Sequence, residues 1–146
     1  MRKWYKEYQS SFNYKNKPMK TEVIYNSSLH FEHKQWRSEL AFWEDELKSF
    51  NKRLSELVMQ WTDKNVLVQL EHFQNQFTLH GTVIDKLQDD IALHEINMSD
   101  HSKKGEDVLN QSFVKKHMAF RNRMETQRQI YADLKKAFFR FLSKHI

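Results

Sequence analysis

The sequence of 146 residues contains no cysteine, only two glycines and one proline. Without cysteine the chain forms no disulfide or thiolate metal site, so any metal would need histidine and carboxylate ligands. Two glycines do not provide the glycine-rich loop of a nucleotide-binding site, and such a chain lacks the turn residues of a β-sandwich. Abundant Leu, Lys, Glu, Gln and Arg favour long helices. The composition therefore predicts an all-α protein.

Long hydrophobic runs are also missing. No stretch approaches the roughly 18 apolar residues that a membrane span requires. The first 12 residues are basic, but they lack the apolar centre of a secretory signal. We therefore expect a soluble, cytoplasmic protein, and the length suits one compact domain.

What the sequence does contain is a regular hydrophobic pattern with a 4,3 spacing, which we call a seam. Three seams of ten positions each occupy residues 29–61, 66–98 and 113–145. A 3.5-residue period is typical of helices that pack along a shared line. Short connections make sequential helices antiparallel neighbours. The pattern predicts an elongated up-down-up three-helix bundle with coiled-coil-like seams.

The domain boundaries follow from the breaks in this pattern. Residues 1–26 form a basic aromatic tail or short helix, and residues 27–146 form the bundle, with helices at about 28–61, 64–98 and 103–145. Thr62, Asp63 and Asn65 predict a tight turn after the first seam, although one uninterrupted long helix remains an alternative. The second break, residues 99–107, contains Gly105 and several short polar residues.

The net charge of +5 is concentrated at the N-terminus. Residues 1–20 contain six basic residues and one acid, whereas residues 21–146 contain 18 of each sign. Within the bundle, residues 62–99 are mainly acidic and residues 103–146 mainly basic, which suits helices that pair with each other. Because the body has no surplus of positive charge and no base-reading motif, the pattern disfavours nucleic acid as a partner.

The relative register of the helices can be predicted by aligning the three seams with the second one reversed. In heptad terms, three glutamates occupy successive g positions of the first helix, and three basic residues occupy successive e positions of the third. The alignment pairs Glu32 with Arg121, Glu39 with Arg128, and Glu46 with Lys135. This is the g-to-e arrangement of parallel neighbours in coiled coils.

Six polar residues interrupt the seams, and five of them are histidines: His33, His80, His94, His117, Gln127 and His145. The register gives several of them ordinary partners, because a buried polar group without one costs about 1–3 kcal/mol. It predicts a hydrogen bond between Gln127 and the Trp43 indole, and one between His80 and Tyr131. It also places His145 beside Trp61.

The other three histidines, His33, His94 and His117, fall in one layer between two apolar layers. Three converging imidazoles could bind Zn²⁺ or another His-ligated transition metal. Asp90 and His30 are candidate auxiliary ligands, and Glu32, Glu95 and His101 flank the layer. Such groups could supply a fourth ligand or accept hydrogen bonds from the metal-bound imidazoles. The alternative is a hydrogen-bonded layer without metal that fixes helix pairing.

Familiar catalytic motifs are absent. No histidine follows a glutamate by three residues, as in di-iron bundles, and none has His or Glu four residues later, as in zinc proteases. The sequence predicts no catalytic residue and no cofactor other than the metal of the alternative. A noncatalytic role is therefore expected.

Helix-forming residues 70–77, LEHFQNQF, followed by Ile84-Asp85-Lys86-Leu87, resemble those of uncharacterised short helical-bundle proteins of Bacteroidota-type bacteria, over residues 27–146. This resemblance implies a cytoplasmic bacterial protein and carries no activity or site residues. We expect an interaction or scaffolding protein that binds a protein partner or itself. The alternative is a metal-binding bundle centred on His33, His94 and His117.

Overall fold

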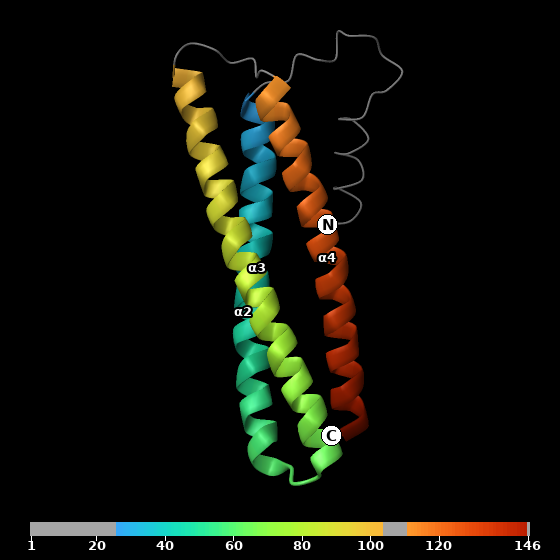
Figure 1. Ribbon diagram of the computed structural model, residues 1–146. Coiled ribbons are helices and arrows are strands. Elements are labelled where there is room, and N and C mark those ends of the chain that lie inside the picture. The colour runs from blue at the N-terminus through green and yellow to red at the C-terminus, as the bar shows by residue number, and fades with distance from the viewer. Residues whose placement is uncertain (1–25, 104–110, 146) are drawn as a thin grey trace, which may run out of the picture.

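The computed structural model describes the backbone of residues 26–103 and 111–145, and the side chains of residues 28–100 and 111–145. Three helices make up this part of the chain: α2 (Asn26–Gln60), α3 (Lys64–Lys103) and α4 (Gln111–His145). They pack as an elongated bundle in which α3 runs back along α2, and α4 then runs in the same direction as α2 (Figure 1). The predicted all-α, up-down-up three-helix bundle is confirmed.

The turn between α2 and α3 is built by Asp63. Its Oδ1 accepts hydrogen bonds from the backbone N–H groups of Asn65, at 2.8 Å, and Val66, at 3.4 Å. Asp63 is therefore the N-cap of α3, and it satisfies donors that the first helical turn leaves unpaired. The predicted tight turn is confirmed, and the alternative of one uninterrupted helix is wrong.

The helix bounds differ from the predicted ones mainly at the second connection. The predicted break began at Ser99, but α3 continues to Lys103, and α4 begins at Gln111 rather than at residue 103. Ser99 and Asp100 are polar, but neither forces the backbone out of a helix, and the first glycine in this stretch is Gly105. The predicted tail, residues 1–26, lies outside the described residues apart from Asn26, where α2 begins.

The core follows the three seams. A large apolar cluster extends from Trp36 and Ile91 down to Leu57, Val66 and Phe141. A second, small cluster contains Leu29 and Met98, with Phe113 packed against it. The two clusters lie on opposite sides of the layer predicted to contain three histidines, as the seam alignment required. None of the helices in the described part of the chain is long and apolar enough to cross a membrane.

The three predicted interhelical ion pairs are all present. Arg128 contacts Glu39 at 2.6 Å, Lys135 contacts Glu46 at 2.9 Å, and Arg121 contacts Glu32 at 2.7 Å. They confirm that α2 and α4 are parallel and fix their register. The Glu32–Arg121 pair differs from the other two because both residues are buried, with 1% and 3% of their surface exposed.

Candidate metal centre

The three predicted histidines meet on the bundle axis, one from each helix. The ring centroid of His33 lies 4.9 Å from that of His117 and 5.2 Å from that of His94. One ring nitrogen from each of the three lies within 4.8 Å of the others. All three side chains are buried. The structure therefore brings together the candidate ligand set that the seam alignment predicted.

Two carboxylates hold the rings of His33 and His117 in place. Nδ1 of His33, on α2, faces Oε2 of Glu95, on α3, at 2.7 Å. Nε2 of His117, on α4, contacts Oε1 of Glu32, on α2. Arg121 holds the Glu32 carboxylate from the other side by donating from Nε at 3.0 Å and from Nη2 at 2.7 Å. Each of the two imidazoles therefore has one nitrogen directed at a carboxylate of another helix.

The remaining nitrogens of these two rings face each other, with His33 Nε2 3.0 Å from His117 Nδ1. Glu95, His33, His117 and Glu32 thus form a row with three contacts: Glu95–His33, His33–His117 and His117–Glu32. A hydrogen bond at each contact would require three protons, but the two neutral imidazoles carry only one proton each. If each ring donates its N–H to its carboxylate, the two lone pairs between the rings point at one another. A third proton or a metal cation must then lie between them.

Burial opposes the third proton. It lowers the pKa of His33 to about 4, even though the Glu95 carboxylate acts in the opposite direction. Burial also lowers the pKa of His117, against the raising effect of Glu32. Both carboxylates remain ionised: burial raises the pKa of Glu32, but hydrogen bonds from His117 and Arg121 outweigh it and lower the pKa overall. At neutral pH, therefore, the inner nitrogens present lone pairs.

His94 completes the layer from α3. Its Nε2 atom is buried without a hydrogen-bond partner. Burial, together with the neighbouring His33 and His117 rings, lowers the pKa of His94 to about 4. A buried polar atom without a partner costs about 1–3 kcal/mol, and neutral imidazole nitrogen is a good ligand for borderline metals.

The geometry near His33 and His117 fits a metal centre. Two nitrogens bound to a tetrahedral Zn²⁺ at about 2.0–2.1 Å lie about 3.3 Å apart, close to the observed 3.0 Å. The widest pair in the group would have to close by at most about 1.5 Å to reach the same separation. The carboxylates of Glu95 and Glu32 take the outer N–H groups, as they do behind many metal-bound histidines.

This geometry is the basis for assigning a function, because similarity provides none. No known protein family, curated protein or solved structure matches the chain.

The two predicted auxiliary ligands lie in different surroundings. His30 contacts Oε1 of Glu95, at the partly exposed side of the layer. Asp90 is instead engaged by Arg123 of α4, at 3.1 Å, and by Lys86, at 3.4 Å. The structure thus brings His30 to the cluster, but it does not bring Asp90 there. The side chain of His101 lies outside the described residues.

The other seam histidines are explained by packing, with partly different partners from those predicted. His145 meets Trp61 edge to face, at a centroid distance of 5.8 Å, as predicted. His80 Nδ1, however, pairs with Gln127 Nε2 at 2.7 Å, while the Tyr131 hydroxyl donates to Glu46 at 3.1 Å. The predicted His80–Tyr131 and Gln127–Trp43 hydrogen bonds are wrong, because His80 and Gln127 pair with each other across adjacent layers and Tyr131 donates to Glu46.

Sequence reasoning placed Glu32 and Glu95 beside the layer, as a fourth ligand or as hydrogen-bond acceptors behind the imidazoles, without deciding between the two roles. Both carboxylates are next to a seam histidine in the sequence, in the pairs Glu32-His33 and His94-Glu95. Each reaches across to the histidine of a different helix rather than to its own neighbour. A carboxylate adjacent to a seam histidine was the available signal.

Proposed function

We propose that this protein is a noncatalytic helical bundle that binds one divalent transition metal, of the Zn²⁺ class, through His33, His94 and His117. The observation that carries the proposal is the 3.0 Å approach of His33 Nε2 and His117 Nδ1, whose outer nitrogens both face carboxylates. With both imidazoles neutral and each donating to its carboxylate, the two facing lone pairs are satisfied by a metal cation between them. His94 supplies the third ligand from the third helix, so the metal would link all three helices.

The proposed centre is suited to a structural or storage role. All three histidines are buried, and apolar layers cover both sides of the cluster. A ligand that binds the folded chain alone stabilises it by RT ln(1 + [L]/Kd), which is about 2.7 kcal/mol at 100 times Kd. Metal binding would therefore raise the free energy of unfolding of the bundle.

Replacing His94 by leucine tests the proposal sharply. Because Nε2 of His94 has no hydrogen-bond partner, the His94→Leu variant should fold at least as stably as the wild type without metal. Its Zn²⁺ affinity, measured by competition with a chromophoric chelator on untagged protein, should fall by more than about tenfold, since loss of an outer-shell partner already costs 10–100-fold. The wild type should contain at least one metal per chain by elemental analysis.

The matched control is His80→Gln, which removes another buried histidine of α3 that pairs with Gln127 outside the cluster. This variant should keep the wild-type metal content and affinity. Equal Zn²⁺ affinity in wild type, His94→Leu and His80→Gln would overturn the assignment of His94. Substoichiometric metal in the wild type after incubation with Zn²⁺ would overturn the proposed function.

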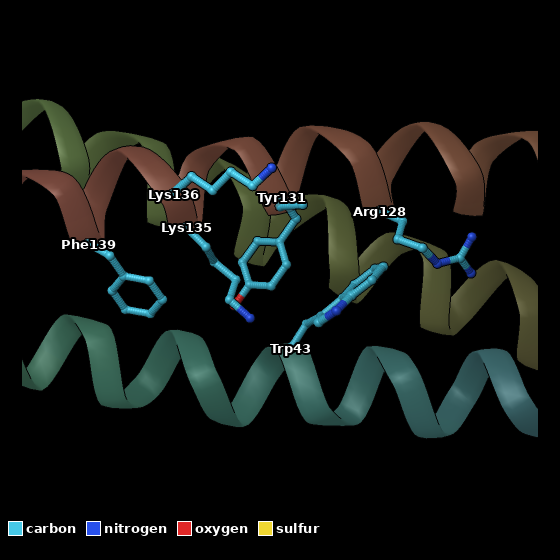
Figure 2. A pocket seen from close by; sticks show the side chains of 7 residues that line it. Trp43, Arg128, Tyr131, Lys135, Lys136 and Phe139 are labelled. Atoms are coloured by element: carbon cyan, nitrogen blue, oxygen red, sulfur yellow. The ribbon is translucent and has the colours of Figure 1, made fainter. Parts of the chain in front are cut away.

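A second candidate function, self-association, is favoured by an aromatic surface on the α2–α4 side. A groove of about 270 Å³ lies there, lined by residues that include Trp43, Tyr131 and Phe139. Figure 2 shows Trp43 of α2 and Tyr131 of α4 directed toward one another, with Phe139 further along α4. Phe42 is 58% exposed and Phe139 46% exposed. Exposed aromatic side chains beside a groove are typical of interaction sites.

We expect the Phe42→Ser/Phe139→Ser variant to lose self-association, because it removes the two exposed rings from this face. Size-exclusion chromatography with light scattering should show a wild-type dimer and a monomeric variant. The matched control is Met59→Ser, which removes an 87% exposed apolar side chain near the far end of α2. A strictly monomeric wild type at high protein concentration would contradict this second candidate.

A further inference from the structure

A second group of metal-ligating atoms lies on the outer side of His33. Oε2 of Glu95 faces Nδ1 of His33 at 2.7 Å, and Oε1 of the same carboxylate contacts Nδ1 of His30. One atom from each of His30, His33 and Glu95 lies within 4.8 Å of the others. This group shares His33 with the buried triad but uses the opposite ring nitrogen.

The outer group differs from the triad in its access to solvent. The side chains of His30 and Glu95 are 33% and 21% exposed, whereas that of His33 is 1% exposed. Water can therefore complete the coordination sphere of an ion at this position, and an ion can reach it from outside. A carboxylate with two imidazoles suits Zn²⁺ and Cu²⁺.

The orientation of His33 connects the two groups. Its Nε2 atom is directed at the inner partner, His117, and its Nδ1 atom at the outer partner, Glu95. We propose that His30, Glu95 and Nδ1 of His33 bind a second divalent cation, and that His33 bridges the inner and outer ions as an imidazolate. This inference rests on the proposed function, because the inner ion occupies the other nitrogen of the bridge.

The proton balance of this step is simple. In the singly loaded protein, Nδ1–H of His33 is donated to Glu95. When the second ion binds, this N–H bond breaks, the nitrogen lone pair forms a bond to the ion, and the proton passes through the partly exposed Glu95 carboxylate to solvent. No electron is transferred. The imidazolate charge and the Glu95 carboxylate offset part of the added positive charge, while Glu32 remains held by Arg121.

The two sites should fill in order. The outer ion is more hydrated and is repelled by the inner ion, so it should bind more weakly. Cu²⁺ is the probe, because its unpaired electron distinguishes isolated from bridged ions. The first equivalent added to untagged protein should give a full electron paramagnetic resonance signal. The second equivalent should lower the spin count below that of two isolated ions, since an imidazolate bridge couples them antiferromagnetically.

At saturating Cu²⁺, the His30→Ala/Glu95→Gln variant should bind one ion per chain with the full signal of one isolated ion. Its affinity for that inner ion should fall by about 10–100-fold, because Glu95 also holds His33. Asp90→Asn is the matched control, because it neutralises a carboxylate of α3 with similar exposure, and it should bind two coupled ions. If the double variant folds poorly by circular dichroism, His30→Ala alone replaces it, since this side chain lies at the exposed edge.

The outcomes separate the two proposals. One ion per wild-type chain, with the full signal, overturns the outer site and leaves the proposed function intact. Two ions with the spin count of isolated centres overturn the bridge. Two coupled ions in the His30→Ala/Glu95→Gln variant overturn the assignment of its ligands. No stoichiometric ion in the wild type overturns both the proposed function and this inference.

Discussion

Replacing Glu32 by alanine should lower the free energy of unfolding by about 3–5 kcal/mol, the usual cost of breaking a buried ion pair by removing one partner. Glu32 and Arg121 are both buried, and two hydrogen bonds join them. The substitution leaves the guanidinium of Arg121 in the core without this carboxylate and also removes the acceptor of His117. Urea denaturation in the presence of a chelator measures the loss without a contribution from metal.

The chain provides a control for this experiment one heptad further along. Glu39 pairs with Arg128 at the same heptad positions, but these side chains are 11% and 29% exposed. Because exposed and partly exposed ion pairs contribute only about 0.2–1 kcal/mol, Glu39→Ala should cost about 1 kcal/mol at most from the ion pair. Equal losses for Glu32→Ala and Glu39→Ala would show that burial does not determine the strength of the first pair.

The fold and register were predictable because they depend on periodicity. Three seams of equal length leave few alignments, and the matched charges of Glu39 with Arg128 and Glu46 with Lys135 select one of them. That alignment alone places His33, His94 and His117 in one layer. A candidate site built from seam positions of straight helices can therefore be located from the sequence.

The hydrogen-bond partners inside the core were less predictable. The alignment assigns residues to layers, but a long side chain can reach the next layer along the axis. His80 pairs with Gln127 in this way, and Tyr131 turns outward to Glu46. Such choices depend on rotamers and on competition between acceptors, which a heptad pattern does not contain.

The burial of Glu32 was not predictable from its position either. The g and e positions lie at the edge of a helix interface, where Glu39 and Glu46 retain some exposure. At the histidine layer, a donor within the core, Nε2 of His117, draws the Glu32 carboxylate inward, and Arg121 follows it. The end of α3 was also misplaced, because polar residues such as Ser99 and Asp100 permit either a helix or a loop.

Acid should destabilise the metal-free protein well above the pH at which ordinary carboxylates titrate. The pKa of His94 falls from 6.5 to about 4 on folding, mainly through burial, and that of His33 falls to about 4 as well. Because the folded pKa is the lower one, unfolding takes up protons between these values. The stability is complete above pH ~6.5 and is lost progressively as the pH falls toward the folded pKa. His94 alone contributes on the order of 3 kcal/mol to this loss.

The charged groups around the histidine rings titrate in a different pH range from the rings themselves. Glu95 on α3 contacts His33, and Glu32 on α2 contacts His117. Arg121 on α4 holds Glu32 and acts electrostatically on His117, and Lys116 of α4 acts electrostatically on His94. The pKa values of Glu32 and Glu95 are lowered from 4.5, because hydrogen bonds to the neighbouring histidines outweigh the raising effect of burial. Their stabilisation therefore persists until the pH falls below about 4.5, and the window above it reports the histidines.

Urea denaturation of chelator-treated protein at several pH values between ~7 and ~5 measures this dependence. The His94→Leu variant should show a shallower loss than the wild type, because it removes one histidine that folding keeps neutral. Glu39→Gln is the control, since it alters a partly exposed carboxylate outside the layer and should leave the wild-type slope unchanged. A flat wild-type profile across this window would mean that the three imidazoles are not held neutral in the folded protein. The lone-pair argument for the metal centre would then fail as well, because a charged ring would supply the third proton between His33 and His117.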